Sequence, residues 1–367
     1  MSSESPHPEP LTNRRDLIKF LTVAGIAVGA AGFGIYEDKV QNDPAHYVGD
    51  LEANPVQAVR ALGELEERDN DRHLFDGVMQ FLQVLPSETI PRQAKDLEAA
   101  HRVGLYSINM VDLNGLNLND PKTEKPIVRE YFESLFGELN THGLAPGDVG
   151  TFVLCPEFVV GYNGVSTEYV PYLNMFLEEI KQVGPSAKTS NMVDLAETVD
   201  LLDKLPNVNT NLLDQVGIQA LANSDKITFD EQGQADISDY LSTDRIEEVV
   251  NAIGGNKPVW LNTGIIRADQ KLGVEYSLKQ RIAIAEATAN VVRDLQQRGI
   301  DIGSVNLFAE NELNGRNLAK DKAGRDFSFH SGEDEKILTI FAKRMLDLDV
   351  ELSGYAVPHD MLKTGRL

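Results

Sequence analysis

Short apolar runs that alternate with amphipathic helical stretches constrain the fold of this chain more than any other feature of its sequence. Eight such runs follow one another at intervals of roughly 30 to 45 residues, and a helical pattern follows each of them. Strands joined by crossover helices pair in parallel, so the chain forms either a closed barrel or an open doubly wound sheet. The predicted strands are residues 45–50, 74–82, 104–113, 149–157, 187–195, 215–223, 257–263 and 303–310.

Two features favour the closed barrel, a (β/α)8 or TIM-type α/β fold in a single domain. No glycine-rich phosphate loop of the G-x-G-x-x-G or G-x-x-x-x-G-K-S/T type follows any predicted strand. The segments after the strands are long and polar, whereas the segments before them are short and end in glycine. Barrel enzymes carry their functional residues on the loops at the carboxyl ends of the strands, so we expect the site there.

The composition limits the partners and cofactors of the protein. The 34 Lys and Arg residues are outnumbered by 57 Asp and Glu residues, which gives a formal net charge of -23. Such acidity argues against a nucleic-acid partner, because binding phosphates requires a basic surface. The single cysteine, Cys155, excludes an intrachain disulfide, and no Cys/His cluster has the spacing of a zinc site. No cofactor is predicted.

The first 36 residues have the pattern of an export signal. Asn13-Arg14-Arg15-Asp16-Leu17-Ile18-Lys19 precedes a weakly apolar, Gly/Ala-rich run, and this arrangement resembles a twin-arginine signal. Cleavage after Ala30 and retention as a membrane anchor both remain open, and an uncleaved anchor is the only membrane contact expected. We predict a signal at residues 1–36, a linker at 37–44, a barrel domain at 45–367, and a periplasmic, cell-surface or extracellular location.

Carboxylates, amides and aromatic residues cluster at the predicted strand ends. Carboxylates and amides match sugar hydroxyls, and aromatic rings stack on the apolar faces of pyranose rings. Cleavage of a glycosidic bond requires two carboxylates, one acting as an acid and the other as a nucleophile or base. The candidates for substrate binding are Asp50, Asp112, Tyr162, Asn163, Asp194, Gln219, Trp260, Asn262 and Phe308.

Four segments together resemble retaining glycoside hydrolases of the β-mannanase type. They are Pro156-Glu157 followed by Tyr162-Asn163-Gly164, Val216-Gly217 leading to Gln219, Lys257-Pro258 leading to Asn262-Thr263-Gly264, and residues 304–311 with Phe308. These enzymes carry an acid/base glutamate at the end of strand four and a nucleophilic glutamate at the end of strand seven. The resemblance implies a (β/α)8 fold and hydrolysis of O-glycosidic bonds in a poly- or oligosaccharide.

The resemblance also assigns roles to individual residues. With residues 149–157 counted as the fourth strand, Glu157 is implied to be the general acid/base. With residues 257–263 counted as the seventh strand, Asn262 occupies the nucleophile position, and asparagine cannot serve as a carboxylate nucleophile. Two interpretations keep the chain an enzyme: Glu310, Glu312 or Asp194 completes the pair, or Asn262 positions a substrate that supplies its own nucleophile.

Two alternatives stay open at the level of the sequence. A barrel without a nucleophile could bind glycans at the cell surface without cleaving them. A different barrel enzyme could bind a metal ion through the oxygen ligands Asp112, Glu157, Asp194 and Glu310.

Overall fold

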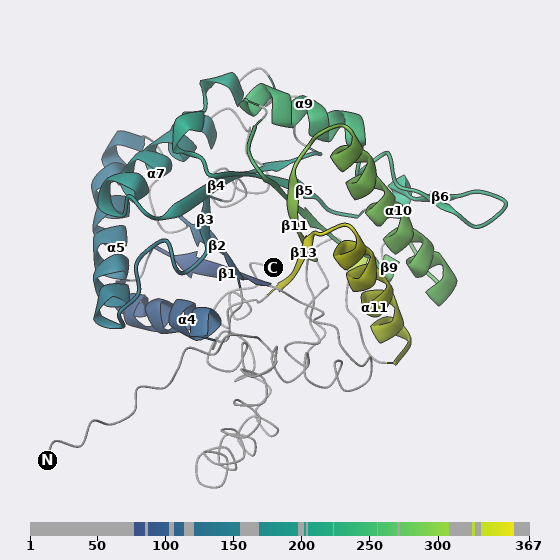
Figure 1. The fold of residues 1–367 in the computed structure, drawn as a ribbon, viewed down its shortest axis with the longest axis horizontal. Helices are drawn as coiled ribbons and strands as arrows, with labels where there is room; N and C mark the ends of the chain where they lie inside the picture. Colours follow the sequence, from purple (N-terminus) through teal and green to yellow (C-terminus); the bar gives the residue numbers. More distant parts are fainter. Residues whose placement is uncertain are drawn as a thin grey trace, which may run out of the picture.

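Eight parallel strands close into a ring, which confirms the predicted (β/α)8 fold (Figure 1). The computed structural model describes residues 77–84, 87–102, 106–113, 121–154, 169–196, 202, 205–222, 224–254, 256–269, 272–307, 325–326 and 332–355. The barrel strands are β1 (Gly77–Gln83), β2 (Tyr106–Asp112), β3 (Thr151–Leu154), β4 (Lys188–Asp194), β5 (Gln215–Ala220), β8 (Val259–Thr263), β11 (Ile302–Leu307) and β13 (Glu351–Tyr355). The parallel pairing of β1 with β13 closes the ring.

Helices surround the ring of strands on the outside (Figure 1). They are α4 (Ile90–Arg102), α5 (Pro121–Thr141), α7 (Tyr169–Val183), α9 (Thr243–Ile253), α10 (Leu278–Gln297) and α11 (Gly332–Asp347). Short 3-10 turns lie at η3 (Ser87–Thr89), η5 (Leu205–Asn207), η6 (Thr210–Leu212) and η7 (Ser224–Lys226). The segments after β5, β8 and β11 also form a hairpin, β6 (Thr228–Phe229) with β7 (Ala235–Asp236), and a small sheet of β9 (Ala268–Asp269), β10 (Val274–Glu275) and β12 (Arg325–Asp326).

The predicted numbering of the strands was wrong by one. The eight positions of the closed ring begin with β1, and the strand predicted at 45–50 and the helix predicted at 55–67 lie outside the described residues. The strand that leads to Glu157 is therefore β3, the third of the barrel, and β4 with Asp194 is the fourth. Asn262 lies on β8, the sixth strand, so it does not occupy the strand-seven position. The seventh strand is β11, which precedes Glu310 and Glu312.

The eighth strand, β13, was missed because its sequence lacks an apolar run. It reads Glu-Leu-Ser-Gly-Tyr, with one aliphatic side chain and one glycine. Its pairing with β1 on one side and β11 on the other supplies the backbone hydrogen bonds that hold it in the ring. Position in the barrel thus outweighs the weak strand preference of these residues.

An aromatic cluster joins β3 to the helices that cover it. The Phe132 ring on α5 lies 6.0 Å from the Phe152 ring on β3 and 5.6 Å from the Phe176 ring on α7, both in edge-on arrangements. All three residues are fully buried. Because large aromatic side chains contribute most to the burial of apolar surface, this cluster anchors β3 between its two helices.

The barrel interior is filled by methionines and a single tryptophan. Met110 and Met192 face away from the helix-packing residues that alternate with them along their strands. Trp260 is 1% exposed, and its indole Nε1 donates a 2.8 Å hydrogen bond to Ser190 Oγ. Gly217 makes room for the indole, since a Cβ atom at this position would lie 2.3 Å from Trp260 Cζ2.

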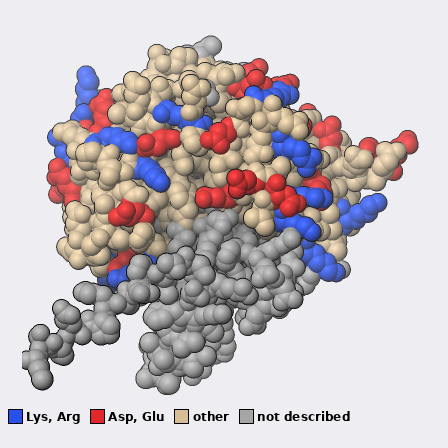
Figure 2. Space-filling view, in the orientation of Figure 1, with Lys and Arg blue, Asp and Glu red and all other residues tan. Residues whose placement is uncertain are grey.

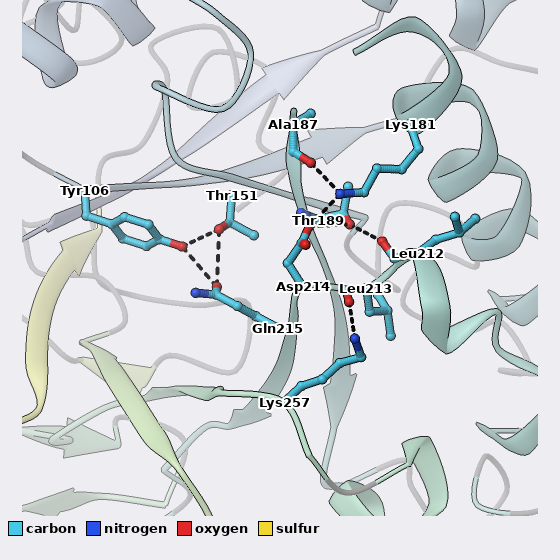
Figure 3. Close-up of polar contacts among 10 residues, drawn as sticks. All are labelled: Tyr106, Thr151, Lys181, Ala187, Thr189, Leu212, Leu213, Asp214, Gln215 and Lys257. Atoms are coloured by element: carbon cyan, nitrogen blue, oxygen red, sulfur yellow. Dashed lines mark hydrogen bonds and ion pairs between the residues drawn. The ribbon is translucent and has the colours of Figure 1, made fainter. Parts of the chain in front are cut away.

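Polar side chains bridge strands near the amino-terminal end of the barrel interior (Figure 3). The Tyr106 hydroxyl contacts the Thr151 hydroxyl and donates to Gln215 Oε1 at 3.0 Å. Burial raises the pKa of Tyr106, so the phenol stays a neutral donor at physiological pH. Polar residues at this end of a barrel typically serve stability.

A second group of hydrogen bonds holds the turn between η6 and β5 against the start of β4 (Figure 3). Lys181 Nζ and the Thr189 backbone N–H donate to Asp214 Oδ2 at 2.7 and 2.8 Å. Burial alone would raise the pKa of Asp214, but these two bonds outweigh it and lower the pKa. Lys257 Nζ also donates to the Leu213 carbonyl, so the start of β8 is tied to the same turn.

A buried carboxylate clamps α5 to α7. Glu179 is fully buried, with Lys125 Nζ 2.9 Å from its Oε1 and Arg129 Nε 2.5 Å from its Oε2. Burial favours the protonated acid, yet the bonds from Arg129 and Lys125 prevail and lower the pKa of Glu179. The carboxylate is therefore ionised and paired at neutral pH.

Replacing Gly217 with alanine tests the packing of the barrel interior. The new methyl group would collide with the Trp260 ring and with the Asn191 carbonyl, 2.3 Å away. We expect Gly217→Ala to lower the free energy of unfolding by about 1–3 kcal/mol in urea denaturation. The control is Gly137→Ala on the exposed face of α5, where no atom lies within 4 Å of the new carbon. It should stabilise the protein by about 0.5–1 kcal/mol. Equal stabilities of the Gly217 variant and the wild type would contradict the packing described.

The clamp at Glu179 predicts a pH-dependent loss of stability. A carboxyl group with a lowered pKa stabilises the fold above its ordinary value of 4.5 and loses that contribution as the pH falls through the lowered pKa. Glu179→Gln should therefore cost about 1–2 kcal/mol at pH 7, and the difference from wild type should shrink below about pH 4. The matched control, Glu178→Gln, removes an exposed carboxylate 3.3 Å from Lys125 and should change little. A pH-independent difference for the Glu179 variant would contradict the clamp.

Candidate functional site

Five of the predicted site residues lie within the described residues, all on barrel strands. They are Asp112 on β2, Asp194 on β4, Gln219 on β5, and Trp260 and Asn262 on β8. The other predicted residues, Asp50, Glu157, Tyr162, Asn163, Phe308, Glu310 and Glu312, lie outside the described residues. Their roles stay predictions.

Asp194, Gln219, Asn262 and Asn306 form a continuous line of hydrogen bonds, which we call the amide row. Gln219 Nε2 donates to Asp194 Oδ2 at 2.9 Å, and Asn262 Nδ2 donates to Gln219 Oε1 at 2.8 Å. Asn306 Nδ2 donates to Asn262 Oδ1 at 2.6 Å. These side chains stand on four adjacent strands at matching register, near the carboxyl-terminal end of each strand.

The amide row lies at the boundary between the packed interior and the mouth of the barrel. Gln219, Asn262 and Asn306 are buried, with at most 4% of their surface exposed, whereas Asp194 is half-buried. At the far end of the row Asn306 Nδ2 also lies 3.6 Å from the Met79 sulfur on β1. The row therefore follows four adjacent strands of the barrel and ends in a half-buried carboxylate.

Both oxygens of the Asp194 carboxylate accept hydrogen bonds. Oδ2 accepts from Gln219, and Oδ1 accepts from the backbone N–H of Ala196 at 2.8 Å. Two donors on one carboxylate hold it in a single orientation and match the acceptor-only character of its ionised form. Asp194 thus presents a carboxylate in a fixed orientation at the end of the fourth strand.

Asn306 was missed in the sequence, although the strand that carries it was predicted. The strand predicted at 303–310 extends three residues beyond the last residue of β11, so the sequence placed the polar strand end at Glu310 and not at Asn306. It shares inward strand parity with Ser304, and this alternation is the signal that could have identified it.

Trp260 and Asp112 lie at different levels along the barrel axis, although each is 1% exposed. Trp260 lies two residues before Asn262 on β8, and its hydrogen bond to Ser190 and its 1% exposure favour a role in packing over sugar stacking. Asp112, the last residue of β2, is 1% exposed. It pairs with Gln83, the last residue of β1. Both residues therefore lie at the carboxyl-terminal end of the barrel, the end that carries the amide row.

Three glutamates follow barrel strands at the same distance in sequence. Glu157, Glu197 and Glu310 each stand three residues beyond the last residue of β3, β4 and β11, respectively. Glu197 was not among the predicted site residues, although its spacing after an apolar run equals that of Glu157. All three belong to segments that leave the carboxyl-terminal end of the barrel, where barrel enzymes carry their catalytic groups.

Hydrogen bonds fasten the loop after β5 to the loop after β8. Ser224 Oγ donates to Asp269 Oδ2 at 2.6 Å, and the Tyr276 hydroxyl donates to the Ser224 carbonyl at 3.2 Å. Burial, together with the nearby Asp269 and Asp225 carboxylates, raises the pKa of Tyr276 to about 12. The phenol therefore remains a donor at neutral pH, and the two loops form one wall beside the mouth.

The described residues contain no group of three or more His, Cys, Asp or Glu side chains placed to hold a metal ion. Among the helices that the structure describes, none is long and apolar enough to cross a membrane. On the face shown in Figure 2, the described acidic and basic side chains are interspersed among uncharged ones, and no broad basic area is visible.

Neither a protein-family model nor a curated protein matches the sequence. Solved structures share the fold at low identity. The AHE enzyme from Alicyclobacillus herbarius aligns with a TM-score of 0.52 and 9% identity, over 80% of this chain and 88% of that chain. An apo β-glucosidase aligns with a TM-score of 0.51 and 10% identity, over 80% and 89% of the two chains.

The β-glucosidase from Thermotoga maritima in complex with castanospermine gives a TM-score of 0.51 and 9% identity, over 79% of this chain and 86% of that chain. Likeness at such identities shows the fold alone. The chain folds as a TIM barrel, an architecture that it shares with these enzymes.

Proposed function

We propose that the protein is an exported glycoside hydrolase that cleaves O-glycosidic bonds in a poly- or oligosaccharide at the carboxyl-terminal mouth of its barrel. The observation that carries the proposal is the corrected strand count. Retaining glycosidases of the type that the sequence resembles use carboxylates after strands four and seven. Here Asp194 and Glu197 stand at the end of strand four, and Glu310 and Glu312 follow strand seven.

The corrected count gives the strand-seven position a carboxylate again. By the predicted strand count, Asn262 occupied the position of the nucleophile. This was the reason to consider a glycan-binding barrel without activity. Since Asn262 lies on the sixth strand, it is no longer a reason to expect an inactive barrel. A non-catalytic glycan-binding protein remains a distinct outcome of the experiment below.

The chemistry requires one carboxyl group to protonate the leaving oxygen and a second carboxylate to act on the anomeric carbon directly or through water. Glu310 is our candidate for the second group, with Glu312 as its neighbour. Glu197 is our first candidate for the general acid/base, because it follows the fourth strand. Glu157, the residue that the sequence predicts for this role, follows the third strand at the same spacing and is its rival. The amide row supports the proposal by holding an anionic carboxylate and buried amides beneath this mouth.

The sugar that would occupy the mouth is a neutral or cationic one. The formal charge of -23 and the ionised Asp194 disfavour anionic glycans by repulsion. The solved β-glucosidases with this fold make aryl β-glucosides the first substrates to assay.

Single glutamine variants test the catalytic pair. Glu157→Gln, Glu197→Gln and Glu310→Gln are assayed on aryl β-glycosides with good and poor leaving groups and on a panel of oligosaccharides. The variant that lacks the nucleophile or base should lose at least about 10³-fold in kcat/KM on every substrate. The variant that lacks the acid should lose about 10²–10⁴-fold only where the leaving group needs a proton. Glu275→Gln, on the exposed side of β10, is the matched control and should keep wild-type turnover.

The outcomes of this assay separate the candidates. Loss of turnover in the Glu157 variant and not in the Glu197 variant assigns the acid/base to Glu157, and the reverse assigns it to Glu197. Wild-type turnover in all three variants would sink the proposed mechanism. Retention of glycans by the wild type without release of any product would establish the glycan-binding alternative.

The export signal is tested by replacing its arginines. Twin-arginine export depends on the arginine pair, so Arg14→Lys combined with Arg15→Lys should leave the protein inside the producing cell. Cell fractionation and N-terminal sequencing of the exported protein measure location and cleavage together. Lys19→Arg is the control and should leave export unchanged. Export of the double variant at the wild-type level would refute a twin-arginine signal.

A further inference from the structure

Asn262 occupies the middle of the amide row and bonds to both neighbours. Its Nδ2 donates to Gln219 Oε1 at 2.8 Å, and its Oδ1 accepts from Asn306 Nδ2 at 2.6 Å. The side chain is 2% exposed, so water cannot substitute freely for either bond. The orientation of the Asn262 amide therefore couples the orientation of the Gln219 amide to that of the Asn306 amide.

The carboxylate at the end of the row accounts for the direction of the hydrogen bonds along it. The ionised Asp194 carboxylate can only accept, so Gln219 must turn its NH2 group toward it. The carbonyl oxygen of Gln219 then faces β8, and it requires a donor from Asn262. The same reasoning orients Asn306, whose NH2 group faces the Asn262 oxygen.

We propose that Asn262 is a positioning residue that holds the Gln219 amide, and through it the Asp194 carboxylate, in a fixed orientation at the barrel mouth. Asparagine is required at this position because it donates on one side and accepts on the other. Asn262 thus supports the site from beneath and does not stand in for a lost nucleophile. Only the idea that this orientation serves a bound sugar rests on the proposed function.

The substitution Asn262→Asp should damage the row. The new carboxylate has no donor to offer Gln219, so two carboxylates compete for one NH2 group. If Gln219 turns toward β8, its oxygen faces the Asp194 carboxylate. If it does not turn, its oxygen faces the new carboxylate. Either arrangement leaves acceptors in contact inside a poorly solvated site.

A second substitution should repair this damage by reversing the row. In the double variant Asp194→Asn with Asn262→Asp, the residue at 194 can donate its NH2 group to Gln219 and still accept from the Ala196 N–H. Gln219 then turns and donates to the carboxylate at 262, which also accepts from Asn306. The three hydrogen bonds of the row are restored, and the charge has moved from the end of the row to its middle.

The experiment is a double-mutant cycle in the full-length protein, with the folding equilibrium constant measured by urea denaturation at pH 7. We expect Asn262→Asp alone to lower the constant at least about ten-fold, and the double variant to recover most of that loss. The matched control is Asn191→Asp, which places a carboxylate at a buried position of β4 outside the row. Adding Asp194→Asn should not rescue that control.

Three results would overturn the inference. They are unchanged stability of Asn262→Asp, absence of rescue in a double variant that folds, and equal rescue of the Asn191 control, which would mean simple relief of charge repulsion. If Asn262→Asp does not fold, a folded double variant is itself the rescue.

A second measurement applies if both variants fail to fold. With ¹⁵N-glutamine labelling, the Gln219 side-chain NH2 signal, assigned through Gln219→Glu, is compared between the wild type and Asn262→Ala. Faster exchange of this NH2 group in the variant supports the inference, and unchanged exchange refutes it. None of these measurements depends on enzymatic activity, so a negative glycosidase assay leaves the result for the amide row standing.

Discussion

The parallel pairing of β1 with β13 is the interaction on which the rest of the structure depends. A twisted sheet of eight strands would expose two unpaired edges, and this ladder removes both by joining the first strand to the last. Closure also brings the carboxyl-terminal ends of all eight strands to one mouth. Residues separated by more than 200 positions in the chain thereby come into contact, as Met79 and Asn306 do at the end of the amide row.

The two ends of the closed barrel use polar groups differently. At the amino-terminal end, hydroxyls, lysines and Asp214 are paired with one another and with backbone carbonyls, which ties the strands and turns together. At the carboxyl-terminal end, three neutral amides lead to one half-buried carboxylate. The first arrangement stabilises the fold, and the second holds a half-buried carboxylate at the carboxyl-terminal end of the barrel. We therefore locate function at the second end.

Much of the fold could be predicted from the sequence, because seven of the barrel strands are apolar enough to stand out from the helices between them. β13 could not, since Ser353 and Gly354 interrupt its pattern and its place is set by pairing with β1 and β11. The sequence analysis counted a strand at 45–50 as the first and omitted β13 at the end. Every strand between them was therefore numbered one too high. This numbering gave Asn262 the rank of strand seven and Glu157 the rank of strand four. Asp194, Gln219 and Asn262 were each predicted at strand ends, but their common row was not. Side-chain hydrogen bonds across strands depend on register, and register appears only in the folded barrel.

The central claim is that the mouth beside the amide row binds a glycan between two carboxylates. A crystal structure of the wild type, soaked briefly with an oligosaccharide and flash-cooled before cleavage, tests this claim most directly. The claim predicts a glycosidic oxygen at the carboxyl-terminal mouth, with carboxyl groups from the segments after β3 or β4 and after β11 on either side of it. Their separation, measured in the wild-type barrel, should be about 5–5.5 Å for a retaining enzyme or about 6.5–9.5 Å for an inverting one. A sugar bound elsewhere, or bound at the mouth beside a single carboxylate, would contradict it.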